Sequence, residues 1–167
     1  LWVNLPRTHK RMAPRYQDLR AADIPEATSP DGRVRLRVIA GEALGVSAPT
    51  RTVTPVTYLH ARLDAGAALD LPVSSDHNLA VYVFEGSVEV GGTGVGRGQL
   101  VVLGPGDTLR LTTDAPAQAL VLGGQPLNEP VAWGGPFVMN TRGEVRQAYR
   151  DFQDGHMGSI PPEIVKA

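Results

Sequence analysis

The fold class is decided by the stretch Leu79-Ala-Val-Tyr-Val-Phe-Glu-Gly86. Its first six residues are all apolar or aromatic, so both faces of a strand formed by them would be apolar. A strand with apolar side chains on both faces belongs in a sheet that is covered on both sides. Glu85 and Gly86 are expected to end this strand. A few residues further on, Gly91-Gly92 can supply the positive φ angles of a tight hairpin. The stretch therefore predicts a central strand followed by a hairpin.

Further short apolar runs flank this strand on both sides and are separated by Gly and Pro. Many short strands at such spacing predict an all-β sandwich or barrel. Residues 1–33 contain several prolines and little periodicity, so we expect an extended arm there, with the barrel over 34–125. The remaining expected strands are Val34–Ala40, Val53–Leu63, Ser87–Val90, Gln99–Leu103, Thr108–Thr112 and Gln118–Leu122.

One helix is expected, at about 141–154, within a C-terminal segment of residues 126–167. Thr141 and Glu144 have the spacing of a capping box. The residues that follow have the period of an amphipathic helix, and this pattern stops before Gly155. We expect the apolar stripe to be buried. It consists of Val145, Ala148, Tyr149 and Phe152.

The segment before this helix reads Gln125-Pro-Leu-Asn-Glu-Pro-Val-Ala-Trp-Gly-Gly-Pro-Phe-Val-Met-Asn-Thr141. Its prolines favour extended backbone, and its bulky apolar residues are expected to anchor a strap to the barrel. The alternative is a strap that lines a cleft between two domains. The expected anchors are Leu127, Trp133, Phe137 and Met139.

Composition excludes several classes of protein. The 167 residues carry 16 basic and 17 acidic side chains, a net charge of −1, so no strong positive field favours nucleic acid or a membrane surface. The absence of cysteine excludes disulfides and thiolate ligands. No apolar run approaches the ~20 residues of a membrane span. We expect a cytoplasmic protein, and the preference for Arg over Lys suggests a bacterial gene.

Both ends of the chain resemble the pirin family, a family of two-cupin proteins. The resemblance rests on the run Gln125–Thr141, on Leu1-Trp-Val-Asn-Leu-Pro-Arg-Thr-His-Lys10 and on Pro14-Arg-Tyr-Gln-Asp18, and it covers nearly the whole chain. It implies a cupin, or jelly-roll, β-barrel that forms the second half of a pirin. Because the chain begins with Leu1 inside an apparent strand, we expect it to be a piece of a longer protein.

Two segments resemble the frames of a cupin metal site, Val81-Tyr-Val-Phe-Glu-Gly86 and Gly98-Gln-Leu-Val-Val-Leu-Gly-Pro-Gly-Asp107. In cupins these frames place histidines and a glutamate that suit Fe, Mn, Ni or Cu. Here the ligand positions of the resemblance fall on residues that cannot replace those ligands, so we expect no metal in this chain. The degenerate positions are Val73, Ser75, Leu79 and Leu109.

The alternative to a chain without metal is a site formed by two histidines. His77 lies two residues before Leu79, and His60 lies in a neighbouring expected strand. Two ligands alone hold a metal weakly, and an imidazole that bonds a backbone carbonyl or faces water is the commoner case. His60 and His77 are therefore weak metal candidates. His9 and His156 lie in terminal segments, where a surface role is expected, and no catalytic residue is assigned.

The resemblance also implies functions. Bacterial pirins are similar to quercetin 2,3-dioxygenases, with Fe or another divalent transition metal in the N-terminal cupin, and animal pirins act as transcriptional coregulators. The first expectation is thus a non-metal cupin that serves as the scaffold or interaction half of a two-cupin protein. The alternatives are a protein-interaction or coregulator module and a metal-free cupin that binds a small ligand.

The resemblance to the pirin family also implies partners. The expected partner is the N-terminal cupin half of the same protein or a second copy of the chain. Without its natural cover, the expected strand Leu1–Val3 and the helix stripe would expose apolar surface, which drives association. We therefore expect a homodimer or strand-exchanged dimer, with Trp2, Trp133, Phe137, Tyr149 and Phe152 as interface or structural residues.

Overall fold

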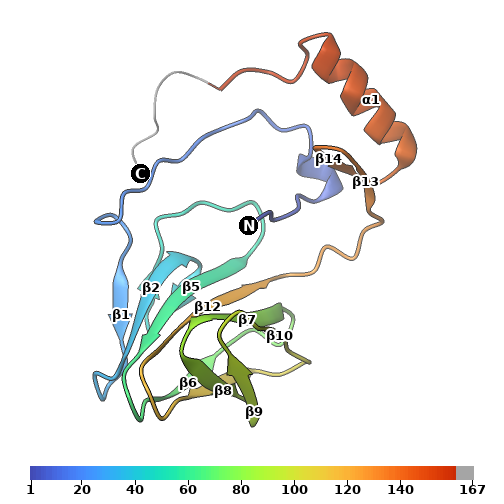
Figure 1. The fold of residues 1–167 in the computed structure, drawn as a ribbon. Coiled ribbons are helices and arrows are strands. Elements are labelled where there is room, and N and C mark those ends of the chain that lie inside the picture. The colour runs from blue at the N-terminus through green and yellow to red at the C-terminus, as the bar shows by residue number, and fades with distance from the viewer. Residues whose placement is uncertain (161–167) are drawn as a thin grey trace. The chain divides into compact units, whose positions relative to one another are not determined.

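The computed structural model describes residues 1–160 and separates the chain into two compact units (Figure 1). The barrel unit spans Leu19–Pro126. The terminal unit combines Leu1–Asp18 with the residues from Leu127 onward. The sequence-based boundary at 33/34 differs from this division, because strand β1 (Glu26–Thr28) pairs with β2 (Val34–Ala40) and so belongs to the barrel.

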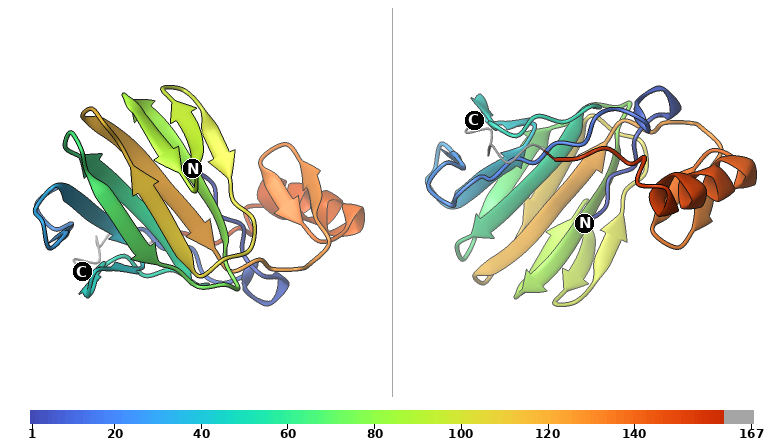
Figure 2. Two further views of the ribbon diagram at one scale, coloured as in Figure 1. Left: turned by 90° about the horizontal axis from the view of Figure 1, so that it is seen from below. Right: turned by 90° about the horizontal axis from the view of Figure 1, so that it is seen from above.

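The barrel unit consists of two antiparallel sheets, a six-stranded one and a four-stranded one (Figures 1 and 2). The larger sheet has the order β1, β2, β5 (Val56–Leu63), β12 (Ala117–Gly124), β7 (Asn78–Glu85), β10 (Leu100–Val102). The smaller has the order β6 (Ala68–Pro72), β11 (Thr108–Thr112), β8 (Ser87–Val90), β9 (Thr93–Gly96). A short hairpin joins β3 (Glu42–Ala43) to β4 (Val46–Ser47). The all-β prediction is confirmed.

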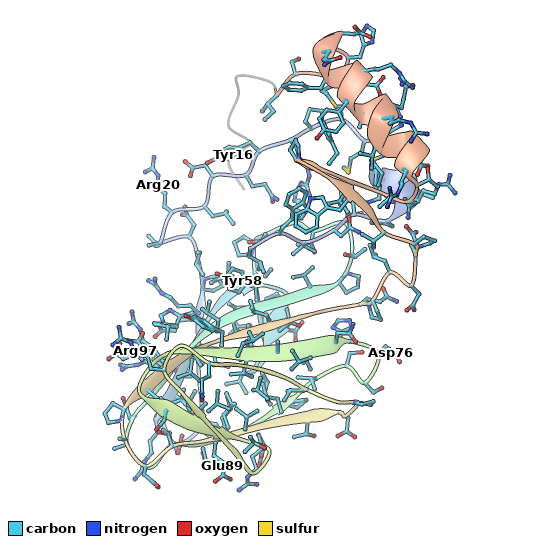
Figure 3. The ribbon with its side chains drawn as sticks, turned by 45° about the vertical axis from the view of Figure 1, so that its right-hand side comes forward. Tyr16, Arg20, Tyr58, Asp76, Glu89 and Arg97 are labelled. Carbon is cyan, nitrogen blue, oxygen red and sulfur yellow. The ribbon has the colours of Figure 1, made fainter. Side chains whose placement is uncertain are left out.

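The core lies between the two sheets, because each strand alternates buried and accessible positions. Along β7, Leu79, Val81 and Val83 are buried, while the residues between them are half-buried on the outer face. Figure 3 shows Tyr58 of β5 and Glu89 of β8 on the two opposite outer sides of the barrel. Central strands of the larger sheet thus carry apolar residues on both faces, as the sequence pattern predicted.

Several elements match the predictions closely, and others do not. Gly91 and Gly92 have φ angles of 54° and 83° and close the β8–β9 hairpin, in which Val90 pairs with Thr93. The glycine-rich residues that follow this turn form strand β9. Strand β6 was not predicted, since five residues that include Asp70 and Pro72 give a weak strand signal.

The terminal unit contains a short 3-10 helix η1 (Arg7–His9), the hairpin β13 (Ala132–Gly134) and β14 (Phe137–Met139), and helix α1 (Arg142–Gln153). The predicted helix is confirmed, with Thr141 as its N-cap. The strand expected at Leu1–Val3 is absent. Residues 161–167 of the predicted C-terminal segment lie outside the described residues.

Within residues 1–160, no helix is both long enough and apolar enough to cross a membrane.

Candidate functional site

The two leucines among the four positions that the cupin resemblance assigns to ligands lie inside the barrel. Leu79 on β7 is 6% exposed and Leu109 on β11 is 2% exposed, and both belong to the hydrophobic core. Because β7 and β11 lie in different sheets, the two side chains extend into the core from opposite walls. Leu111 on β11 and Val81 on β7 extend the same aliphatic lining.

The other two ligand positions precede β7. Val73 is half-buried and packs against the core, whereas Ser75 is exposed in the turn that leads to His77. Aliphatic side chains have no lone pair to donate, and a single exposed hydroxyl is a poor ligand for Fe, Ni or Cu. These four residues therefore do not fit the metal that the cupin frame implies. Among residues 1–160, no three His, Asp or Glu side chains gather in a metal-binding group.

His60 lies on the outer face of the larger sheet. Its neighbours Leu59 and Ala61 are fully buried, so alternation directs the imidazole away from the core. Its Nε2 lies 2.8 Å from Oε1 of Gln118, whose Nε2 donates to Glu85 at 2.6 Å. The His60 ring also packs near the Phe84 ring, with 5.4 Å between centroids. His60 thus belongs to a surface network across β5, β12 and β7.

The structure does not bring His60 and His77 together. His77 precedes Asn78, which pairs through Gly124 with Val56 at the far end of β5. Val56 is four residues from His60, which corresponds to about 13 Å along a strand. The two histidines cannot share one metal ion at that separation. Of the terminal histidines, His9 contacts its neighbour Thr8 through Nδ1 and Oγ1.

A polar cluster, which we call the N-cap cluster, holds the start of α1 and consists of Arg7, Glu129, Asn140, Thr141 and Glu144. Glu144 N–H donates to Thr141 Oγ1 at 3.2 Å, and the Glu144 carboxylate accepts from Thr141 Oγ1, from Asn140 N–H and from Arg7. Partial burial acts to raise the pKa of Glu144, but the bonds from Thr141 and Arg7 outweigh it and lower that pKa. The predicted capping box is therefore present and is extended by Arg7.

The same cluster ties the two distant segments of the terminal unit together. Glu129 accepts hydrogen bonds from Arg7 N–H at 2.8 Å and from Asn140 Nδ2 at 2.9 Å. Lys10 Nζ donates to Asn4 Oδ1 and to the carbonyl of Val138. Burial lowers the pKa of Lys10, although Glu129 and Glu144 oppose this effect. Sequence reasoning missed the roles of Arg7, Lys10 and Glu129, although all three lie in the quoted family runs.

The β13–β14 hairpin packs directly on α1. Phe137 contacts Tyr149, and Gly134 lies so close to the helix that a Cβ there would be 2.7 Å from Val145 Cγ1. Gly135, with a φ of 53°, lies against the Tyr149 hydroxyl. The glycines of the Trp-Gly-Gly-Pro run thus permit close hairpin–helix packing.

Apolar side chains are concentrated on the surface of the terminal unit. The predicted helix stripe is buried only at Val145 and Ala148, whereas Tyr149 and Phe152 are exposed. Trp133 is 77% exposed and its Nε1 donates to Gly135 O, so its expected role as a buried anchor is wrong. We call the following residues the apolar terminal surface: Leu1, Trp2, Val3, Met12, Trp133, Tyr149, Phe152 and Met157.

A pocket of about 420 Å³ opens in the terminal unit. Both apolar and polar groups line its walls, which come from the N-terminal segment, from β14 and from α1. Trp2, Phe137 and Met157 contribute the large side chains, and His156 lies at the same pocket. Trp2, Val3, Met12 and Met157 of the apolar terminal surface line this pocket, and Tyr149 and Phe152 contact its wall residue Phe137, so together they make a candidate docking site.

Comparison with known proteins agrees with the geometry. The chain matches the pirin C-terminal cupin domain over residues 58–158. It is 40% identical to pirin of Mus musculus over 164 residues, which cover 95% of this chain and 56% of that protein. It is also 40% identical to a pirin-like protein of Caulobacter vibrioides, with coverage of 93% and 56%. The chain spans about half the length of the curated relatives it matches.

Among solved structures, the chain resembles a quercetin 2,3-dioxygenase from Acinetobacter baumannii. The TM-score is 0.85 at 38% sequence identity, and the match covers 95% of this chain and 56% of the other. The sequence match and the fold agree, and the chain belongs to the pirin family through its C-terminal cupin domain.

Proposed function

We propose that this chain is the non-metal scaffold half of a two-cupin protein and that its apolar terminal surface docks the N-terminal, metal-binding cupin. The observation that carries the proposal is the contrast between the two units. Leu79 and Leu109, at two of the positions that the cupin resemblance assigns to ligands, are buried in the aliphatic core of the barrel, while Trp2 and Phe152 are 62% and 65% exposed on the terminal unit.

The length of the relatives supports this choice of partner. The pirins it matches are nearly twice as long as the matched region, so they contain a further part of domain size. Large exposed apolar patches mark interaction sites, and aromatic side chains dominate the binding energy of such sites. A covering domain would remove this surface from water.

For the intact protein we propose dioxygenase activity on a flavonol such as quercetin, as the name of the Acinetobacter baumannii relative suggests. The metal, Fe or another divalent transition metal, would be held by the N-terminal cupin, since Leu79 and Leu109 offer no ligand here. This chain would position that cupin and cover one side of it. A homodimer formed through the apolar terminal surface is the competing outcome.

The docking proposal is tested by mixing this chain with the N-terminal half of the Caulobacter vibrioides relative and measuring association by calorimetry. We expect a complex, and we expect Phe152→Glu to weaken it at least tenfold because a carboxylate would be buried against apolar surface. Leu44→Glu, at an exposed leucine of the barrel unit, is the matched control and should leave the affinity unchanged. No association, or equal affinity for Phe152→Glu, would refute the proposal.

Activity gives a second test of the same proposal. The assembled pair, supplied with Fe²⁺, should consume quercetin and dioxygen, whereas this chain alone should consume neither. Turnover by this chain alone would contradict the assignment of the metal to the other half. Association without turnover by the pair would retain the scaffold role and reject the flavonol as substrate.

A further inference from the structure

Strand β10 is an unpaired edge of the larger sheet. It pairs with β7 on one side, with Leu100 opposite Tyr82, Val101 opposite Val81 and Val102 opposite Ala80. In the part of the chain that the structure describes, no strand pairs with its other side. Leu100 is 55% exposed and Val102 is 70% exposed. The edge therefore combines free backbone with two large apolar side chains.

The ladder shows which backbone groups of β10 are free. Val83 N–H donates to Gln99 O at 3.0 Å, and Leu103 N–H donates to Leu79 O at 2.9 Å. Alternate residues of an antiparallel strand bond to the same neighbour, so Val101 also directs its N–H and C=O toward β7. The N–H and C=O groups of Leu100 and Val102 consequently point away from the sheet. They offer two donors and two acceptors in one row.

This row is complementary to itself under a two-fold rotation. A second β10, antiparallel to the first with the axis at Val101, would place Leu100 opposite the partner's Val102 and Val102 opposite the partner's Leu100. Both pairs would be of the hydrogen-bonded type, which gives four backbone hydrogen bonds. We propose that β10 is a homodimer contact through which two copies of this chain join their six-stranded sheets edge to edge.

The two edges of the sheet differ in a way that supports this choice. At the opposite edge, the accessible residues of β1 are Glu26 and Thr28, and a charged or polar edge resists strand addition. Strand β10 has no charged residue and no proline. Its length of three residues is one of the features that limit strand addition at an edge.

The outer face behind β10 continues its apolar character. Leu100 is followed across the sheet by Tyr82 and Leu120, and Val102 by Ala80 and Leu122. Tyr82, Ala80, Leu120 and Leu122 all lie on the outer face of the sheet and are half-buried. Joining two copies at β10 would therefore unite two apolar strips, which favours a second copy over a charged peptide as the occupant. Because β10 has only three residues, we expect a weak dimer that dissociates on dilution.

The contact lies in the barrel unit and does not depend on the docking proposal for the terminal unit. Light scattering over a range of concentrations should show a monomer–dimer equilibrium for the wild-type chain. Val102→Lys should raise the dimer dissociation constant at least tenfold by placing an ammonium beside the partner's Leu100. Val131→Lys carries the same change of charge at a valine that is 66% exposed on the terminal unit, and it should have no effect.

Cross-linking tests the register itself, since the chain has no cysteine of its own. In the proposed register the Cα atoms of Leu100 and the partner's Val102 lie about 5.5 Å apart, within the range of a disulfide. The double variant Leu100→Cys, Val102→Cys should form a covalent dimer on mild oxidation. Each single variant should do so far more slowly, because equivalent residues of two copies are not opposite each other.

Three results would overturn this contact: a strictly monomeric chain at high concentration, a dimer that survives Val102→Lys but is lost with Val131→Lys, or equal cross-linking by the single and double cysteine variants. The second result would assign the dimer to the terminal unit. Circular dichroism of each variant confirms that a lost dimer does not reflect a lost fold.

Discussion

The Phe137 ring meets the Tyr149 ring edge-on, with 4.9 Å between the centroids and 81° between the planes. This contact joins β14 to α1 inside the terminal unit, and Phe152 adds a second edge-on contact to Phe137 at 6.3 Å. Phe137 of the family run therefore holds the hairpin on the helix. Tyr149 and Phe152 keep part of their surface accessible.

Removing the Phe137 ring should weaken the terminal unit selectively. We expect Phe137→Ala to destabilise that unit by about 1–3 kcal/mol, because it loses a partly buried aromatic pair. Amide hydrogen exchange should then speed up about 5- to 150-fold in α1 and remain unchanged in β7 and β12. Val131→Ala, at an exposed site of the same unit, is the control. Equal acceleration in both units would show that the contact does not act locally.

Gly134 should tolerate no side chain. Gly134→Ala would place a Cβ 2.7 Å from Val145 Cγ1 and push the hairpin away from the helix. Overpacking of this kind typically costs about 1–3 kcal/mol. Gly94→Ala on β9 is a matched control, because a Cβ there meets no atom within 4 Å. If chemical denaturation gives the same free energy of unfolding for both variants, the hairpin and the helix do not pack as closely as described.

Acid should loosen α1. Hydrogen bonding from Gln147, opposed by partial burial, lowers the pKa of Asp151, and the pKa of Glu144 is also held below its ordinary value. A carboxyl whose pKa is lower in the folded state binds its proton more tightly when unfolded. Its stabilising effect is complete above the ordinary pKa, 4.5 for Glu144, and is lost as the pH falls through the folded pKa.

The expected result is a helix with constant stability between about pH 5 and 7 and falling stability below about pH 4.5. Glu144→Gln should reduce the pH dependence of the helix stability and lower that stability at neutral pH. Thermal unfolding of α1 measures both effects. Asp76→Asn, in the turn before β7 (Figure 3), is the control for loss of a carboxylate. An unchanged pH profile for Glu144→Gln would reject the role of the N-cap cluster.

Leu109, at the last of the four positions that the cupin resemblance assigns to ligands, should act as a core residue. Leu109→Ala should destabilise the barrel unit by about 2–5 kcal/mol, through lost apolar burial and the cavity left behind. Leu100→Ala, at an exposed position of the barrel unit, should cost much less. If the two variants lose a similar free energy of unfolding in urea, Leu109 is not part of a packed core.

Periodicity and turn chemistry made much of the fold predictable. Strands β2, β8 and β11 have the predicted bounds, because alternation and flanking Gly or Pro are strong local signals. The helix followed from Thr141 and Glu144. Strands β1 and β6 were missed because their pairing with β2 and β11 is nonlocal and their own sequences are short.

Side-chain environments in the terminal unit were less predictable. The bulk of Trp133 predicts a buried anchor, yet Trp133 is exposed at a hairpin whose neighbouring glycines approach the helix. The N-cap cluster joins Arg7 to Glu129 across 122 positions in the sequence, a contact that no local pattern encodes. By contrast, the burial of Leu79 and Leu109 followed directly from alternation within their strands. The expected cytoplasmic location stays a prediction.

The most direct test of the central claim is the transition-metal content of this purified chain, measured at known protein concentration after dialysis against buffer that contained Fe²⁺, Ni²⁺ or Cu²⁺. Since Leu79 and Leu109 occupy ligand positions and His60 faces outward, we predict less than about 0.1 metal ion per chain. Near-stoichiometric metal that is lost on substitution of His60 or His77 would contradict the account and return a metal centre to this half of the protein.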